Sequence, residues 1–138
     1  MERESITIQA HINAPVDRVW DSWNDPEEII RWNAASPDWH TTKASNDFRA
    51  GGLFSYRMES KDGKVGFDFE GIYQEVDFHK LIRYTITDGR RVEIRFTPEK
   101  LITKVFETFE AENIHSVELQ RAGWQAILDN FKRHVESD

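Results

Sequence analysis

Hydrophobic residues alternate with polar ones from Ser5 to Asn13, which predicts a half-buried strand. Pro15 interrupts this alternation and suits the first position of a helix. Helical spacing then connects four apolar residues, Val16, Val19, Trp20 and Trp23. The chain is therefore expected to begin with a strand and a short helix.

A second short helix is predicted directly after the first. We expect Asp25 to cap its N-terminus, Pro26 to occupy its first turn and Glu28 to reach back in a capping box. Its apolar residues are Ile29, Ile30 and Trp32, and the helix should end before Pro37.

Period two returns from about Lys43 and continues to Glu110. It predicts six strands, over the ranges Lys43–Phe48, Leu53–Glu59, Gly66–Asp77, Leu81–Thr87, Arg90–Thr97 and Leu101–Glu110. Short turns rich in glycine or proline separate most of them. In the last strand two pairs compete for the inward face: Val105 with Phe109, and Ile102 with Phe106.

A long helix should close the chain, with Asn113 as its N-cap. Its stripe at three- and four-residue steps comprises Val117, Gln120, Arg121, Trp124, Ile127, Leu128, Phe131 and Val135. About 20 helical residues span about 30 Å, enough to cross a domain. We therefore expect one α+β domain over residues 1–138, with a curved seven-stranded antiparallel sheet, two short helices after the first strand, and the long helix covering the concave face.

Five segments carry a resemblance to a known family. They are Ala14-Pro15-Val16-Asp17-Arg18-Val19-Trp20, Asp25-Pro26-Glu27 through Arg31-Trp32, Arg49-Ala50-Gly51-Gly52, Phe69-Glu70-Gly71-Ile72-Tyr73-Gln74-Glu75-Val76 and Gly123-Trp124-Gln125-Ala126-Ile127-Leu128-Asp129-Asn130. On these segments the chain resembles the START/Bet v 1-like (SRPBCC) superfamily, and within it the bacterial proteins related to the activator of Hsp90 ATPase (AHSA1). The resemblance implies a helix-grip fold, in which the sheet wraps round the C-terminal helix and a hydrophobic ligand cavity lies between them.

The chain departs from the family pattern mainly in loops. One departure bears on the cavity, because Asn33 stands where a second tryptophan commonly follows the Arg-Trp pair. A polar side chain there is expected at the cavity entrance, where it would alter ligand preference.

Large aromatic side chains are abundant, at 12% of the residues. Rings around a hollow with a few polar groups suit an apolar ligand with one polar end. The candidate cavity-lining residues are Trp32, Asn33, Phe54, Tyr56, Phe69, Gly71, Tyr84, Ile86, Ile94, Phe96, Trp124, Ile127, Leu128 and Phe131. The alternative is that the helix residues among them are simply packed core. Gly71, among rings, either lets the helix approach or leaves space.

Charge and composition exclude several function classes. The formal net charge of −7 argues against non-specific binding of nucleic acid or anionic lipid. The absence of cysteine excludes disulfides and thiolate metal sites. The N-terminal segment does not read as a signal peptide and no window predicts a membrane span, so we expect a cytoplasmic monomer or homodimer.

Catalytic and metal-binding signals are weak. The five histidines show no metal-ligand spacing, and no nucleophile-elbow pattern is present, so we predict neither a metal nor a cofactor and assign no catalytic residue. Glu107 is the one carboxylate of interest. It would face inward with Val105 and Phe109 and could then act as an acid or base. The alternative places Glu107 outside the cavity or in a salt bridge.

The sequence thus favours non-catalytic binding of a hydrophobic or aromatic small molecule. Two other classes stay open on the resemblance alone: an enzyme like the polyketide cyclases and dehydratases, and a chaperone partner like the Hsp90 activator. An enzyme would require Glu107 to lie inward beside a polar partner. A chaperone partner would require an exposed apolar patch.

Overall fold

The computed structural model describes residues 3–137 and contains seven strands and three helices. In chain order these are β1 (Ser5–Ile12), α1 (Val16–Asn24), α2 (Pro26–Trp32), β2 (Trp39–Asn46), β3 (Leu53–Ser60), β4 (Gly66–Asp77), β5 (Leu81–Ile86), β6 (Arg91–Glu99), β7 (Ile102–Glu110) and α3 (Val117–Glu136).

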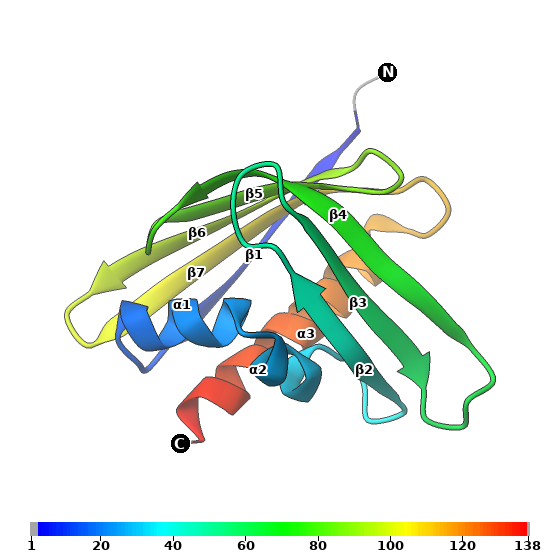
Figure 1. Ribbon diagram of the computed structural model, residues 1–138, viewed down its shortest axis with the longest axis horizontal. Helices are drawn as coiled ribbons and strands as arrows, with labels where there is room; N and C mark the ends of the chain where they lie inside the picture. Colours follow the sequence, from blue (N-terminus) through cyan, green and yellow to red (C-terminus); the bar gives the residue numbers. More distant parts are fainter. Residues whose placement is uncertain (1–2, 138) are drawn as a thin grey trace.

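All seven strands form one antiparallel sheet in the order β1-β7-β6-β5-β4-β3-β2. Consecutive strands from β2 to β7 are neighbours, and β1 completes the sheet by pairing with β7. The sheet curls into a half-barrel, so that β2 and β3 lie at a steep angle to β6 and β7. Helix α3 lies in the concavity (Figure 1). The predicted fold class is confirmed.

Helix α2 begins as the sequence indicates, whereas Pro15 is the N-cap of α1 and not its first residue. Asp25 caps α2, its Oδ1 accepting the backbone N–H of Glu27 at 3.0 Å. Glu28 does not close a capping box. Its carboxylate instead binds Arg18 on α1 at 3.0 Å and His134 on α3 at 2.9 Å, because α3 packs close enough to offer a hydrogen-bonding partner. Glu28 therefore joins all three helices.

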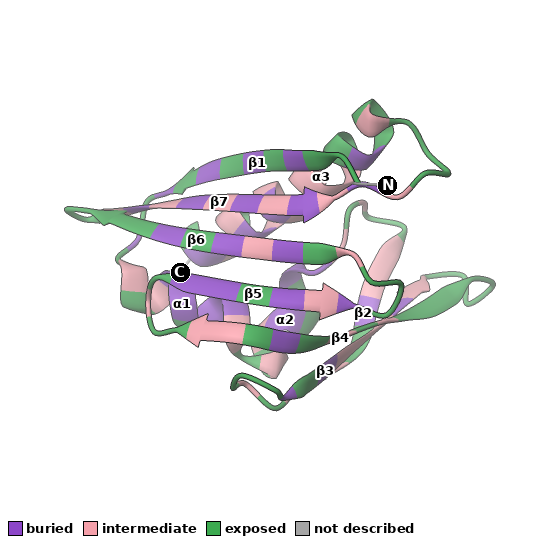
Figure 2. Ribbon diagram, turned by 90° about the horizontal axis from the view of Figure 1, so that it is seen from above, coloured by how far each residue is buried: buried purple, intermediate pink, exposed green. Residues whose placement is uncertain are grey.

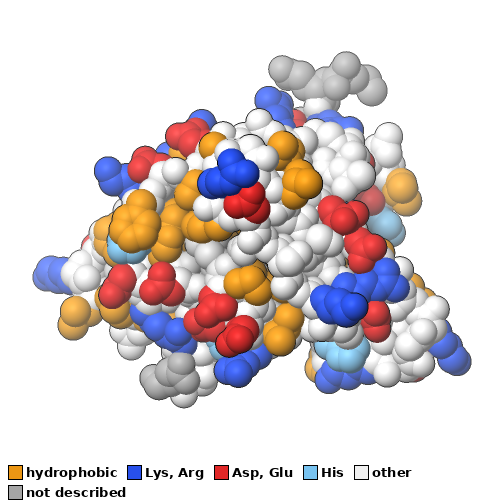
Figure 3. All heavy atoms as spheres, in the orientation of Figure 1, with side chains coloured by type: hydrophobic (Ala, Val, Ile, Leu, Met, Phe, Trp, Pro, Cys, Tyr) orange, Lys and Arg blue, Asp and Glu red, His pale blue; other side chains and the backbone are white. Residues whose placement is uncertain are grey.

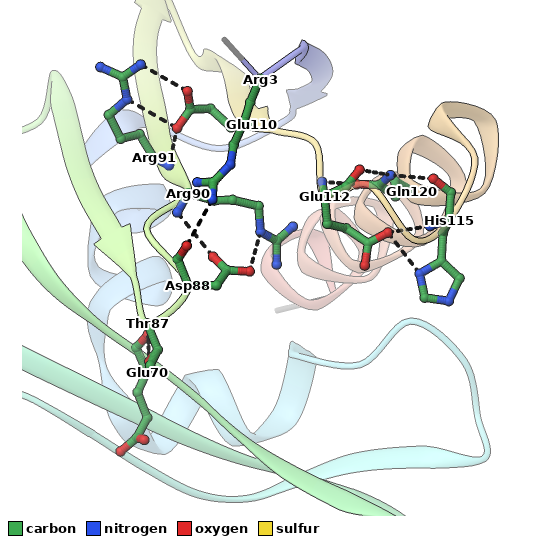
Figure 4. Close-up of polar contacts among 10 residues, drawn as sticks. All are labelled: Arg3, Glu70, Thr87, Asp88, Arg90, Arg91, Glu110, Glu112, His115 and Gln120. Carbon is green, nitrogen blue, oxygen red and sulfur yellow. Dashed lines mark hydrogen bonds and ion pairs between the residues drawn. The ribbon is translucent and has the colours of Figure 1, made fainter. Parts of the chain in front are cut away.

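Helix α3 begins later than predicted. Its N-cap is Ser116, whose hydroxyl accepts the N–H of Leu119 at 3.1 Å, so the prediction of Asn113 as the cap is wrong. Gln120, a polar residue of the predicted stripe, is buried because its side chain hydrogen-bonds to the loop that precedes α3 (Figure 4). Its side chain accepts the N–H of Glu112 at 2.9 Å and donates to the carbonyl of His115 at 2.9 Å.

The largest error in the predicted strands concerns β2, which begins at Trp39 rather than Lys43. Trp39 pairs with Ser60, and a bulge between Thr41 and Lys43 disrupts the alternation that sequence reading depends on. Phe48 lies beyond the strand and packs against Trp20 with a centroid distance of 5.6 Å.

The inward face of β7 is now defined. Val105 and Phe109 are fully buried, whereas Ile102 and Phe106 are half-buried on the other face. Figure 2 shows buried residues alternating with half-buried ones along β7 and with half-buried or exposed ones along most of β6, as a sheet with one covered face requires.

The surface carries charges of both signs and several exposed apolar side chains, among them Phe78, Leu101 and Ile114. Figure 3 shows acidic and basic side chains interspersed over the visible face, with hydrophobic groups between them, several of which gather at its left. Within residues 3–137 no helix has the length and apolarity to cross a membrane.

Candidate functional site

A cavity of about 240 Å³ lies between the sheet and helix α3. Its wall consists of Trp23, Asn24, Trp32, Asn33, Tyr56, Met58, Phe67, Phe69, Tyr73, Ile82, Tyr84, Arg90, Glu107, Trp124 and Ile127. The most exposed of the apolar wall residues is Phe67 on β4, at 47%, and Trp124 and Ile127 on α3 are half-buried. The opening therefore lies between the β3–β4 hairpin and α3.

Helix α3 forms one side of this cavity because a second ring holds its tryptophan in place. Trp124 stacks on Phe109 of β7 with the ring centroids 4.0 Å apart and the planes 8° from parallel. Trp124 also forms a T-shaped pair with Phe69, at a centroid distance of 6.2 Å. The two elements approach here without interdigitating, which leaves the hollow.

Glu107 lies on the inner face of β7, with only 6% of its surface exposed. Its cross-strand neighbours on that face are Ile8 and Ile94, both buried. Burial raises the pKa of Glu107 to about 8, and among residues 3–137 no hydrogen bond or opposite charge offsets that burial. At pH 7 the cavity therefore contains a mostly neutral carboxyl group.

Three tyrosines, Tyr56, Tyr73 and Tyr84, contribute hydroxyl groups to the wall. Burial raises the pKa of Tyr56 and of Tyr73, and the Asn46 side chain donates a hydrogen bond to the Tyr73 hydroxyl at 3.4 Å. Burial, followed by the nearby Glu107, raises the pKa of Tyr84 well above its usual value. All three phenols stay protonated near neutral pH, so the wall carries no phenolate.

Arg90 brings the one permanent positive charge of the described cavity wall. It follows the turn at Gly89, which adopts a φ of +88° that glycine accommodates without strain. Its Nε donates to Asp88 at 2.8 Å, and Arg3 donates to the Asp88 carbonyl at 3.0 Å, so that Asp88 lies between the two arginines (Figure 4). The charge of Arg90 is therefore offset by its ion pair with Asp88.

Comparison with known proteins identifies the family of this chain. The family model described as Activator of Hsp90 ATPase homolog 1-like protein matches residues 13–136. The chain belongs to the AHSA1 family. It has the START/Bet v 1-like fold that the sequence resemblance implied.

Solved structures of other AHSA1-like or similar proteins superpose closely. An AHSA1-like protein from Aeromonas hydrophila is 48% identical, with a TM-score of 0.92 over 97% of this chain and 93% of that one. Chr148 from Cytophaga hutchinsonii is 45% identical, with a TM-score of 0.84 over 96% and 92% of the two chains. Protein CV1439 from Chromobacterium violaceum shares the fold at 22% identity and a TM-score of 0.87, over 98% and 99% of the chains. No curated protein matches the chain.

The candidate residues of this AHSA1-like protein fall into two groups in the structure. On the cavity wall lie Trp32, Asn33, Tyr56, Phe69, Tyr84, Trp124 and Ile127. Away from the wall, in or against the packed core, lie Phe54, Gly71, Ile86, Ile94, Phe96, Leu128 and Phe131.

Packing accounts for the second group. Gly71 leaves no empty space, because a Cβ there would lie 2.6 Å from the Thr85 carbonyl and 2.7 Å from the Phe54 ring. Phe131 fits between Trp23 and Trp32, with both centroid distances at 4.8 Å. The ring of Phe54 and the helix residue Phe131 thus fill space that sequence reasoning assigned to the ligand.

Asn33 is buried on the wall and held in place from two directions. Its Nδ2 donates to the Thr41 hydroxyl at 3.2 Å, and that hydroxyl donates to the Asn33 carbonyl at 2.6 Å. Asn33 therefore presents a fixed polar group to the cavity.

Sequence reasoning missed several wall residues: Trp23, Asn24, Met58, Phe67, Tyr73, Ile82 and Arg90. A signal existed for Phe67 and Tyr73, which share a strand face with Phe69 in the period-two pattern. Arg90 gave no such signal, since a charged residue next to a hairpin turn is normally solvated.

Proposed function

We propose that this AHSA1-like protein binds a hydrophobic or aromatic small molecule without transforming it. One observation supports this function above all, the cavity of about 240 Å³ walled largely by aromatic side chains. Water gains little from the apolar part of such a wall, so an apolar ligand displaces it favourably there. A ligand that buries about 200 Å² of apolar surface gains roughly 5 kcal/mol before the costs of association.

The proposed contact residues are the candidates on the wall. Trp32, Tyr56, Phe69, Tyr84, Trp124 and Ile127 would surround the ligand's apolar body, and Asn33 would meet a polar group of it. The packed candidates Phe54, Gly71, Ile86, Ile94, Phe96, Leu128 and Phe131 would shape the cavity from behind.

Native mass spectrometry of freshly purified protein tests this function directly, and we expect a co-purified apolar compound. Titration with the neutral dye N-phenyl-1-naphthylamine provides a second readout, with fluorescence rising on binding. The substitution Ile127→Trp fills the cavity and should weaken dye binding at least tenfold. Ala122→Trp, at an exposed position on the same helix, should leave binding unchanged. Absence of both a bound compound and dye binding would refute the proposal.

A second candidate function is acid–base catalysis, because Glu107 lies inward with a pKa near neutrality. The superfamily resemblance points to cyclisation or dehydration of a reactive keto compound. A catalytic carboxyl normally has a partner that orients it, and no described residue hydrogen-bonds to Glu107. Conversion of a co-purified compound by the wild type, but not by Glu107→Gln, would favour catalysis over simple binding.

A further inference from the structure

The carboxyl group of Glu107 has an unusual environment for a polar group. Isoleucines flank it on both neighbouring strands, and its small exposed fraction faces the cavity. A buried polar group without a partner costs free energy, far more when the group is charged. The cavity is the one direction in the described structure from which a partner can arrive.

No other group on the described cavity wall is an anion that would compete with Glu107 for a cationic ligand. From the sheet, the groups that face Glu107 are Tyr84 on β5, Tyr73 on β4 and Tyr56 on β3, all protonated near neutral pH. The β5–β6 turn contributes Arg90, which is already paired with Asp88. The helices contribute only side chains that do not titrate, namely Trp23, Asn24, Trp32, Asn33, Trp124 and Ile127.

The surrounding rings also favour positive charge. The faces of Trp, Tyr and Phe carry negative electrostatic potential, and sites for ammonium groups commonly combine several such faces with a carboxylate. This wall contains eight rings, Trp23, Trp32, Tyr56, Phe67, Phe69, Tyr73, Tyr84 and Trp124, around one carboxyl group. An anionic ligand would meet these ring faces and Glu107, with only the already paired Arg90 to attract it.

We propose that the cavity selects ligands that carry a protonated amine, which pairs with the carboxylate of Glu107 while the aromatic wall holds the apolar body. This proposal rests on the proposed function and specifies its ligand class. The pairing gives Glu107 a partner that residues 3–137 do not supply, and the ring faces stabilise the ammonium group.

Proton release follows from this pairing. Because the pKa of free Glu107 is about 8, the carboxyl is mostly protonated at pH 7 and must lose its proton to solvent when the ammonium binds. The ligand amine keeps its own proton. Affinity should therefore rise with pH up to about 8, and binding at pH 7 should release close to one proton.

Three probes with the same ring system test the inference: 1-naphthylmethylamine, 1-naphthalenemethanol and 1-naphthoate. Isothermal titration calorimetry would be run at pH 6.5 and pH 8.0, in buffers of different ionisation enthalpy. In the wild type we expect the amine to bind at least tenfold more tightly than the alcohol at pH 8.0, with the naphthoate weakest. Affinity for the amine should increase roughly tenfold between the two pH values, with measurable proton release.

Two variants complete the experiment. Glu107→Gln keeps the side-chain volume, and its preference for the amine should fall below threefold and lose its pH dependence. Glu110→Gln, on the same strand but facing outward, should retain the wild-type values. Proton release by the wild type tests the inference even if Glu107→Gln folds poorly.

The possible failures are distinguishable. Binding of the alcohol as tightly as the amine, or tightest binding of the naphthoate, would overturn the amine inference and leave the proposed function standing. An amine preference that survives in Glu107→Gln would also overturn it. Failure of all three probes to bind would count against both proposals.

Discussion

The two halves of helix α3 lie against the same sheet in different surroundings. In the C-terminal half, Leu128, Phe131 and Val135 are buried in a solid core. Toward its N-terminus, from Ile127 back to Trp124, the helix is only half-buried and faces the cavity. One continuous apolar stripe therefore packs into the core in one part of the helix and borders the cavity in another.

The difference arises from what packs beneath each half. Helices α1 and α2 lie under the C-terminal half and supply Trp23 and Trp32, which enclose Phe131. Near the N-terminal half the β3–β4 hairpin diverges instead, and much of β4 is exposed in Figure 2. Burial of a stripe thus depends on the elements opposite it as much as on its own residues.

Truncating a ring in each half should give very different losses of stability. We expect Phe131→Ala to lower the free energy of unfolding by about 3–5 kcal/mol, because it leaves a void among packed rings. Trp124→Ala should cost about 1–2 kcal/mol, since that ring already borders empty space. Urea unfolding measures both values, and equal losses would contradict the division of α3 into a packed and an open half.

Glu107, which lines the cavity beside the open part of α3, should make the free energy of unfolding depend on pH. Its folded-state pKa of about 8 lies above the ordinary value of 4.5, so between these values the unfolded chain releases a proton that the folded protein keeps. Stability from this group is complete below pH 4.5 and is lost as pH rises through about 8.

The substitution Glu107→Gln removes this loss of stability at high pH. Relative to the wild type, the variant should gain about 2–4 kcal/mol of unfolding free energy between pH 5 and pH 9. Urea unfolding at pH 5, 7 and 9 checks the trend. A constant difference across that range would mean that Glu107 is solvated in the folded protein.

Gly71 lies in the packed part of the sheet that supports the cavity from behind. Gly71→Ala would press a methyl group against the Thr85 carbonyl and the Phe54 ring, and should cost about 1–3 kcal/mol. Gly123→Ala on α3, where a methyl group meets no atom within 4 Å, is a control expected to be neutral or stabilising. Thermal unfolding of the two variants compares them, and a neutral Gly71→Ala would show that the ring can move aside.

The sequence by itself determined the order of elements, the antiparallel sheet and the inward stripe of α3, apart from Arg121, which is exposed and donates to the carbonyl of Thr7. These follow from local periodicity, from turn residues and from the family segments, each of which depends on residues close together in the chain. Errors occurred where a local signal competed with another, as with Asn113 and Ser116 for the cap of α3, or where a bulge broke the alternation in β2.

Only the tertiary structure decided where the packed core ends and the cavity begins. Phe54 and Tyr56 lie two residues apart on one strand face, yet the first ring fills the space beside Gly71 and the second borders the hollow. The inward position of Glu107 likewise depends on the register between β7 and both of its neighbours. Such distinctions depend on contacts between residues far apart in the chain, which periodicity along a single segment does not encode.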